Sequence, residues 1–421
     1  MRKIILFLML VIMSSTMTTT LGFSFTAENT LTLKMDDYIL LGKYNDVPIL
    51  WKCVDVDENG MLILSDKILC RKPFDMPSMV NGSHVRRSQY GGLYSGSNYW
   101  GDSNIRSWLN SDKPASEIVW LCGNSPYTLR GGSKGYDTEK GFLADGNFTQ
   151  AERDVMKAIP QKSLLDQLDV ELAVSGSTEA WGTGDFNINI KDFMEHQYDE
   201  ICFEYVTDKV FLLDIKQYEK VASQDIGEVR YWLRTPFGRN YQYSGRDTYY
   251  SGYRVLTSSH DSGYVNADIA ELDLGIRPAF YLEEDNAMIL SGSGTAEDPY
   301  VVTGREISVS VDGTEVAFDQ SPIVRGGVVY APLRAIAEQL GAAVSWDEAA
   351  QKVTVQMDGR TIDLTVDMQE MYVDGVMHWL PAPVILKGDR TLVPLQVLTG
   401  GFGLPAEWDS TAQTITITTA G

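Results

Sequence analysis

The sequence has few positive charges. It contains 35 Lys and Arg residues against 57 Asp and Glu residues, which gives a formal net charge of −22 at pH 7. Nucleic-acid binding requires a basic surface that displaces counterions from phosphates, and anionic membranes attract basic segments for the same reason. We therefore expect neither nucleic acid nor a membrane surface as a partner, and we interpret the acidity mainly as an aid to solubility.

Cysteine and histidine are also scarce, with four of each in 421 residues. The cysteines form no CxxC pair, which disfavours a zinc site, and we predict neither a metal nor a cofactor. Three complete disulfide pairings are possible, and the sequence neither selects one nor excludes buried free thiols. The four positions are Cys53, Cys70, Cys122 and Cys202.

The motifs of the common enzyme classes are missing, because the sequence has no HExxH, P-loop or dinucleotide fingerprint. Residues 131–135 match GxSxG, but Arg130 and Tyr136 flank them where a nucleophile elbow needs a core strand and a helix. We therefore predict a protein that is not an enzyme, with no catalytic residues. Carboxylates are abundant, so the alternative is a hydrolase of the cell wall or a polysaccharide with an unrecognised carboxylate pair.

A long apolar run occurs only at the N-terminus, where Ile4–Met13 follows the basic residues Arg2 and Lys3. This run is too short to cross a bilayer and is typical of a signal peptide, with cleavage expected after Gly22. We therefore predict that residues 1–22 are a signal peptide. The protein would then be secreted or associated with the cell envelope, with no membrane insertion after cleavage.

The first part of the predicted mature chain contains strand and helix signals. Apolar periodicity predicts strands at 36–44, 48–56 and 61–65. The joint at 55–60 imitates the start of a calcium loop, but its Asn-Gly sequence between strands favours a hairpin turn. Helices are expected after three polar N-cap positions, the second with Pro160 as its end, at Asp102 or Ser103, Thr149 and Asp214.

The stretch 209–282 organises the first domain. Its apolar runs at 210–213, 231–236 and 274–282 predict core strands. Between the last two lies a segment rich in Tyr, Ser, Gly and Asn, a composition typical of adaptable recognition surfaces. The candidate ligand-binding residues are Tyr241, Tyr243, Tyr249, Tyr250, Tyr253, Arg254 and Tyr264. Alternatively, these tyrosines are cross-strand partners in a hairpin.

Three further polar residues in this region, Asp261, Asn266 and Asp268, are possible calcium ligands, although we assign no metal. Trp232 and Arg234 are expected to be a core residue and a structural ion-pair partner rather than ligand contacts.

Residues 284–304 are acidic and then rich in Ser and Gly, which predicts a linker. Beyond it the sequence repeats itself. Ala331-Pro332-Leu333 returns as Val393-Pro394-Leu395, and Trp346-Asp347 returns as Trp408-Asp409, at a constant offset (394 − 332 = 62). Such a repeat indicates a duplicated supersecondary unit. Each copy reads as strand, helix, Gly stop, strand, Trp-Asp turn and strand, and Gly400-Gly401 should shorten or fray the second helix.

This repeat resembles the copper amine oxidase N-terminal-like domain, a common appendage of secreted proteins of Gram-positive bacteria. The resemblance covers 305–421 and implies a structural or envelope-associating module. Copper chemistry is not implied, because the three His ligands and the Asn-Tyr-Asp/Glu motif of the oxidases are missing. The histidines are scattered, at His84, His196, His260 and His378.

The first domain, 23–283, resembles an uncharacterised family of extracytoplasmic proteins, a domain of unknown function. The resemblance is carried by short segments spread over 36–282, among them 40–44, 48–51, 103–110, 148–149, 209–213, 232–236 and 275–279. The closing Gly275-Ile276-Arg277-Pro278-Ala279 is similar to the terminal core strand of C-type-lectin-like and formylglycine-enzyme-like folds. This similarity implies a ligand face built from loops in the Tyr-rich region.

We therefore predict an α+β protein: a β-rich, C-type-lectin-like first domain, then a small α+β domain made of a duplicated strand-helix-strand-strand unit. The function expected is that of a binding module of the cell surface or envelope. It would recognise a cell-wall glycan or a surface protein through the Tyr-rich face.

Overall fold

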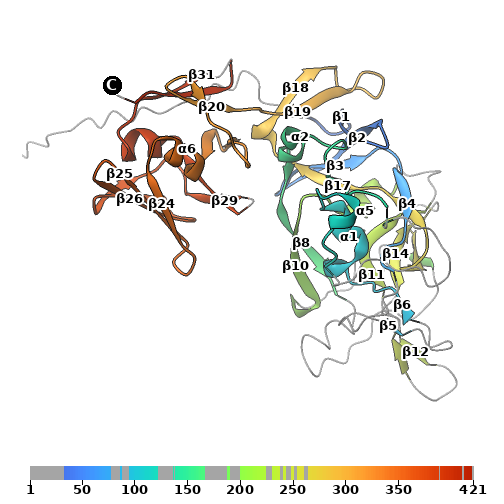
Figure 1. The fold of residues 1–421 in the computed structure, drawn as a ribbon. Helices are drawn as coiled ribbons and strands as arrows, with labels where there is room; N and C mark the ends of the chain where they lie inside the picture. The colour runs from blue at the N-terminus through green and yellow to red at the C-terminus, as the bar shows by residue number, and fades with distance from the viewer. Residues whose placement is uncertain are drawn as a thin grey trace, which may run out of the picture. The chain divides into compact units, whose positions relative to one another are not determined.

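The computed structural model describes residues 33–76, 86–87, 94–121, 136, 138–165, 187–189, 200–223, 230–237, 240–242, 248–250, 254–259, 264–387, 389–409 and 412–419. The predicted signal peptide and the GxSxG segment lie outside them. Backbone contacts divide the chain into two compact units (Figure 1). The N-terminal unit comprises Ala27–Ser308 with Ala317–Arg325, and the C-terminal unit comprises Val309–Val316 with Gly326–Gly421.

A seven-stranded sheet forms the framework of the N-terminal unit. In spatial order its strands are β18 (Ala287–Ser291), β19 (Tyr300–Gly304), β1 (Tyr38–Tyr44), β2 (Val47–Asp57), β3 (Gly60–Ser65), β17 (Ala279–Leu282) and β7 (Met156–Lys157). The sheet is antiparallel except where β1 runs parallel to β19. Residues Met61–Leu64 are all buried, because β3 is an interior strand. The three strands expected at the start of the domain are therefore confirmed.

The turn between β2 and β3 is a hairpin, as its Asn-Gly sequence predicts. Asp57 pairs with Gly60, whose φ of 112° lies in the region that favours glycine. The Asp57 carboxylate accepts a hydrogen bond from the Asn59 backbone N–H (2.8 Å) and another from the Tyr281 hydroxyl (2.6 Å). These bonds stabilise the turn and attach it to β17.

Three short helices begin where their caps predict. The helices are α1 (Asn104–Leu109), α2 (Gln150–Asp154) and α5 (Ile215–Val221). Ser103 caps α1, while Thr149 with Glu152 and Asp214 with Gln217 form reciprocal capping boxes. The expectation that Pro160 ends the second helix is wrong. The helix stops at Asp154 because the chain then pairs with β17 as β7, and Pro160 lies in a strand.

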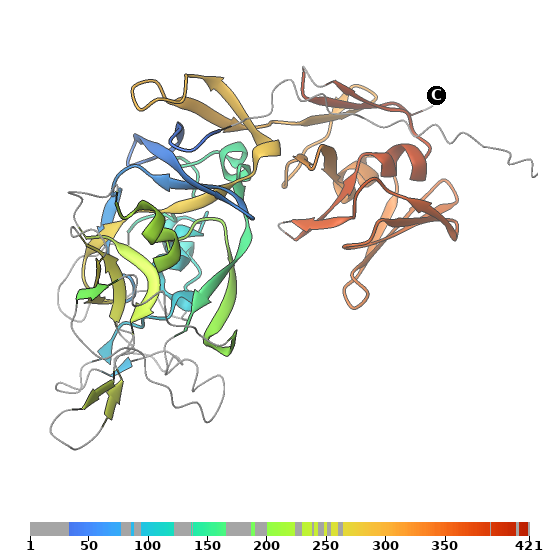
Figure 2. The ribbon, with the colours of Figure 1, turned by 180° about the vertical axis from the view of Figure 1, so that it is seen from behind.

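Smaller sheets and single-turn helices complete the N-terminal unit. The sheets are β8 (Ile159–Leu164) with β10 (Phe203–Asp208); β11 (Trp232–Phe237), β14 (Arg254–Ser258), β15 (Tyr264–Ile269) and β9 (Asn187–Asn189); β12 (Asn240–Gln242) with β13 (Thr248–Tyr250); β16 (Leu274–Ile276) with β4 (Cys70–Lys72); and β5 (Arg86–Arg87) with β6 (Tyr94–Ser95). The single-turn helices are the 3-10 helices η1 (Trp100–Asp102), η2 (Ala115–Glu117), η3 (Glu200–Cys202) and η4 (Glu284–Asn286). Figure 2 shows this unit from behind.

Two expectations about the N-terminal unit need correction. Val210–Leu213 is fully buried, but it makes one isolated bridge, from Phe211 to Ala279, instead of a strand. Residues 284–304, expected to be a linker, form η4 and the β18–β19 hairpin of the main sheet. Their Ser-Gly-rich centre is the hairpin loop, so turn-forming composition marked a loop within the unit rather than a boundary.

The C-terminal unit contains three sheets. One sheet has the order β24 (Ala343–Asp347), β25 (Lys352–Met357), β26 (Arg360–Thr365), β27 (Glu370–Val373) and β28 (Val376–Trp379). Another has the order β21 (Thr314–Glu315), β20 (Ser308–Val311), β32 (Thr414–Ile417) and β31 (Ala406–Asp409). In the third, β30 (Arg390–Pro394) lies between β23 (Val328–Pro332) and β29 (Ile385–Lys387). Helical turns lie between the first two of these sheets in both views, namely α6 (Leu333–Gln339) and η5 (Val397–Gly401) (Figures 1 and 2).

The repeat is longer than its sequence signature. β20 and β27 begin and end 62 residues apart, as do β23 (Val328–Pro332) and β30 (Arg390–Pro394), and also β22 (Ile323–Arg325) and β29 (Ile385–Lys387). The turns repeat as well: Gln351 and Gln413 have φ near 50°, and Asp347 and Asp409 accept hydrogen bonds from the backbone N–H three residues on. The second helix differs, because Val397–Gly401 is a π-helix that includes Gly400 and Gly401.

The two copies are joined through equivalent strands. Ala331 of β23 pairs with Val393 of β30, its own equivalent, which places a local pseudo-two-fold axis between them. The five-stranded sheet and the sheet of β20 and β32 therefore each combine the last hairpin of one copy with the first hairpin of the other. The copies differ in β26, an additional strand that makes one sheet five-stranded.

Candidate functional site

The first candidate site is the Tyr-rich segment. The structure places Tyr241 opposite Tyr249, and Asn240 opposite Tyr250, in the β12–β13 hairpin. This hairpin is a sheet of its own, and it lies at the end of the N-terminal unit farthest from the β18–β19 hairpin (Figure 1). Three of the seven residues are therefore cross-strand neighbours in a two-stranded ribbon, an element that is marginally stable without further packing.

The remaining residues of the segment are distributed differently. Arg254 begins β14 and Tyr264 begins β15, and both strands belong to the sheet of β11. The side chain of Tyr264 is 37% exposed. Tyr243 and Tyr253 lie outside the described residues.

The calcium alternative is not supported at the described positions in this segment. Asp268 already accepts hydrogen bonds from the Thr257 hydroxyl (2.7 Å) and from Arg230 (3.2 Å). The Asn266 side chain donates to the Ser258 carbonyl (3.5 Å), and Asp261 lies outside the described residues. Among the residues that the structure describes, no cluster of three or more His, Cys, Asp or Glu side chains is suited to hold a metal ion.

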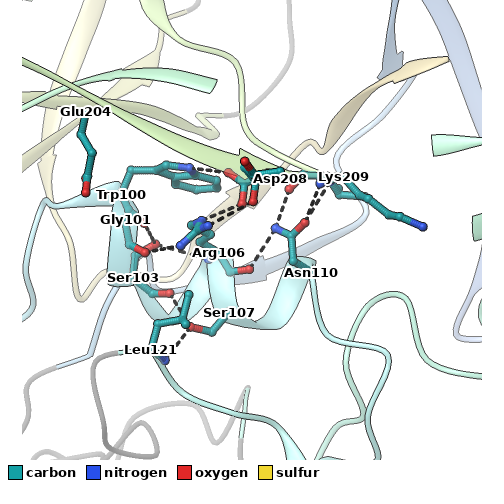
Figure 3. A network of polar contacts seen from close by, with 12 residues as sticks. Trp100, Gly101, Ser103, Arg106, Ser107, Asn110, Leu121, Glu204, Asp208 and Lys209 are labelled. Atoms are coloured by element: carbon teal, nitrogen blue, oxygen red, sulfur yellow. Dashed lines mark hydrogen bonds and ion pairs between the residues drawn. The ribbon is translucent and has the colours of Figure 1, made fainter. Parts of the chain in front are cut away.

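The second candidate is the polar network around α1 (Figure 3). Asp208, at the end of β10, is buried, and its carboxylate accepts hydrogen bonds from Arg106 Nε (2.6 Å) and Trp100 Nε1 (2.9 Å). Arg106 also donates to the backbone carbonyls of Gly101 and Thr207. Burial raises the pKa of Asp208 above its ordinary value, although Arg106 and Trp100 act in the opposite direction.

The same helix attaches the chain that follows β10. The Asn110 side chain accepts hydrogen bonds from the backbone N–H groups of Lys209 and Val210, and it donates to the Val210 carbonyl (2.8 Å). These bonds satisfy the backbone where the strand ends and the buried segment Val210–Leu213 begins. The network therefore has a structural role: it holds two chain segments about a hundred residues apart in sequence.

A third cluster surrounds Lys72. This buried lysine forms an ion pair with Glu139, and its ammonium lies 4.7 Å from the ring centroid of Trp108 and 5.1 Å from that of Tyr136. Glu139 also accepts a hydrogen bond from the Tyr44 hydroxyl (2.5 Å). The lysine charge is thus balanced by a carboxylate and two aromatic faces.

The tyrosines and the cysteine around Lys72 are held in their neutral forms. Burial raises the pKa values of the Tyr44 and Tyr136 hydroxyls above the ordinary range and that of the Cys70 thiol to about 11. A thiol in this state is a weak nucleophile at neutral pH. Sequence reasoning missed this cluster, because Lys72 and Glu139 are 67 residues apart and no motif links them.

Other expected structural roles are confirmed. Arg234 is buried and pairs with Asp214 (2.8 Å), while the buried Trp232 donates to the Lys72 carbonyl (2.9 Å). Cys53 and Cys70 are free thiols, so none of the three complete disulfide pairings is present. Cys122 lies outside the described residues.

The described part of the chain contains no helix that has both the length and the apolar character needed to cross a membrane.

Comparison with known families identifies both parts of the chain. The family described as Domain of unknown function (DUF6273) matches residues 58–284, more than half of the sequence. The family described as Copper amine oxidase N-terminal domain matches residues 310–417 and follows it. No curated protein matches the chain.

Proposed function

We propose that this chain, which belongs to the DUF6273 family of domains of unknown function, is a non-catalytic binding protein of the cell surface or envelope. Its N-terminal unit recognises a cell-wall glycan or a surface protein through the Tyr-rich segment. The C-terminal copper amine oxidase N-terminal domain associates the protein with the envelope. Export of the protein after cleavage of residues 1–22 is part of the same proposal.

The β12–β13 hairpin is the observation that carries this proposal. Its register brings Tyr241 and Tyr249 together, and the hairpin forms a sheet apart from those that build the core. Tyrosine offers a large, rigid surface and a hydroxyl, and both features suit a sugar ring or a protein partner. The proposal includes a C-type-lectin-like fold for this unit, supported by β17, which follows Arg277-Pro278 and lies inside the main sheet.

The polar clusters of the described residues support a non-catalytic role. Asp208 and Asp214 are each engaged by an arginine, and Glu139 is engaged by Lys72. A glycosidase requires two carboxyl groups that face each other across a substrate cleft, one free to give a proton. The partners of these three carboxylates give them a structural role instead.

A sedimentation assay with purified cell walls tests the proposal. We expect the protein to bind, and we expect replacement of Tyr241, Tyr249 and Tyr250 by alanine to weaken binding about tenfold or more, the loss typical of aromatic hot spots. Tyr205→Ala is the matched control, because Tyr205 is 57% exposed on β10, outside the segment. Unchanged wall binding by the triple variant, or release of reducing sugar ends from the walls, contradicts the proposal.

A further inference from the structure

The strand β28 in the C-terminal unit is an edge strand with unusual side chains. It is the last strand of its five-stranded sheet, and all four of its residues are exposed. Three of them are large and apolar: Val376 is 62% exposed, Met377 44% and Trp379 67%. Natural edge strands are normally protected by charge, proline or a bulge, and β28 contains none of these.

The backbone of β28 is also available for pairing. The two-residue turn Asp374-Gly375 has φ values of 50° and 79°, and it closes the pair Val373 with Val376. Hydrogen-bonded and non-hydrogen-bonded pairs then alternate along the hairpin. The N–H and C=O groups of Met377 and Trp379 therefore point away from β27, and within the described chain no strand lies beyond them.

The outer face beside this edge carries a row of exposed apolar side chains. Tyr372 of β27 lies directly across from Met377, and Trp379 lies two residues further along β28. Side chains two residues apart on a strand share one face of the sheet, so all three point to the same side. Tyr372 is 44% exposed.

The duplication shows that the fold does not require these residues. The equivalents of Tyr372 and Met377, 62 residues earlier, are Ser310 and Glu315 in the hairpin of β20 and β21. The same hairpin at the same place in the repeat is thus built with a serine and a charged edge residue. The exposed apolar side chains of the second copy are therefore not needed to form this hairpin.

The charge of this region identifies the kind of partner. From Thr365 to Leu386 the chain carries three carboxylates, at Asp367, Glu370 and Asp374, and no lysine or arginine. A cationic partner is attracted to such a surface, whereas a second copy of this acidic chain is repelled. The exposed faces of tyrosine and tryptophan also attract lysine and arginine side chains.

We propose that β28 is a docking site for an extended, cationic segment of a partner protein, which adds to the sheet as a sixth strand. The backbone of the segment pairs with Met377 and Trp379, while its alternate lysine or arginine side chains lie over Tyr372 and Trp379 and near Glu370. Backbone pairing gives the affinity in this mode of recognition, and the alternate side chains give the specificity.

The test uses the whole chain and a dye-labelled octapeptide that alternates lysine with valine, with binding followed by fluorescence anisotropy. A peptide with glutamate in place of lysine is the control for charge. We expect the lysine peptide to bind, on the order of 10–100 μM. Binding should weaken as ionic strength rises from 50 to 200 mM, because part of the attraction is screened. The glutamate peptide should not bind.

Met377→Pro removes the outward N–H without removing a bond to β27, because the Met377 N–H faces the open edge. We expect it to weaken binding at least tenfold, and Trp379→Ala to weaken it about two- to fivefold. Glu315→Pro is the matched control at the equivalent edge position of the other copy and should have no effect. Circular dichroism verifies that each variant is folded, and Trp379→Ala tests the site independently of proline.

Several results would overturn this proposal. Equal binding of the two peptides, equal binding by wild type and the Met377→Pro variant, or no binding of the lysine peptide at 1 mM would each do so. A dimer of the wild-type chain that Met377→Pro dissociates would replace the partner with a second copy. None of these results affects the Tyr-rich segment, which lies in the other unit.

Discussion

Replacing Asp208 by alanine should destabilise the N-terminal unit by about 3 kcal/mol. The substitution leaves the Arg106 guanidinium, whose side chain is 14% exposed, and the buried Trp100 without their carboxylate acceptor. Removing one partner of a buried ion pair costs about 3–5 kcal/mol, because the other charge stays buried without compensation. The lower end applies here, since Arg106 keeps its bonds to the carbonyls of Gly101 and Thr207.

The measurement is thermal unfolding at pH 7, followed by circular dichroism. For a unit of this size each kcal/mol lowers the melting temperature by about 2–4 °C, so Asp208→Ala should lower it by about 6–12 °C. Asp145→Ala is the control, because Asp145 also accepts from an arginine, Arg153 (2.9 Å), but is 91% exposed. An exposed pair contributes about 0–1 kcal/mol. Equal shifts for the two variants would refute the structural role of Asp208.

The same residue predicts a pH dependence. Burial raises the pKa of Asp208 in the folded state, so the folded protein binds more protons than the unfolded chain above the ordinary aspartate pKa. The stability contributed by this group is therefore largest at low pH and decreases as pH rises towards the folded-state pKa. In Asp208→Asn this decrease should be missing, and the stability difference from wild type should change over that window. A constant difference from pH 3.5 to 7 would contradict the raised pKa.

Two further predictions concern the thiols and the repeat. Burial raises the pKa values of the Cys53 and Cys70 thiols to about 11. Mass-spectrometric mapping should therefore find both unlabelled by a thiol reagent in the native protein at pH 8, and labelled after unfolding in guanidinium. Rapid labelling of the native protein would contradict their burial. Gly341→Ala and Gly403→Ala should each lower the free energy of unfolding in urea by about 1–2 kcal/mol, because both glycines have φ above 70° and their surroundings have room for a methyl group or can adjust. Gly42→Ala should lower it more, since the new Cβ would lie 2.1 Å from the Phe148 ring. Equal losses at all three positions would refute this reasoning.

Local signals predicted local structure well in this chain. Thr149 with Glu152 and Asp214 with Gln217 form the capping boxes that their spacing indicates, because a cap depends only on residues within one helical turn. The repeat was equally visible, since a constant offset of 62 residues needs no knowledge of the fold. The structure extends the repeat to two hairpins whose sequences have diverged, β20–β21 and β27–β28.

Long-range structure could not be predicted in the same way. The apolar run 210–213 indicated burial, but burial alone does not distinguish a strand from an extended segment held by the side chain of Asn110. The Ser-Gly-rich stretch within 284–304 has the composition of a linker and also that of the loop in the β18–β19 hairpin. Arg106 and Asp208 meet across 102 residues of sequence, and a single sequence contains no signal for such a contact.

The candidate sites show the same division. Composition singled out the Tyr-rich segment, and the structure supplies the register that pairs Tyr241 with Tyr249. The edge at β28 was not found from sequence, because Val-Met-His-Trp is an ordinary strand sequence. Its significance depends on the exposure of its side chains and on its place at the end of a sheet.

The central claim is that the Tyr-rich segment recognises the cell-wall or surface ligand. The most direct measurement is binding of the wild-type chain, the variant with alanine at Tyr241, Tyr249 and Tyr250, and the Met377→Pro variant to purified cell walls in one experiment. We predict that the tyrosine variant loses binding about tenfold while Met377→Pro binds as wild type does. Wall binding that survives the tyrosine substitutions and is lost with Met377→Pro would contradict the account.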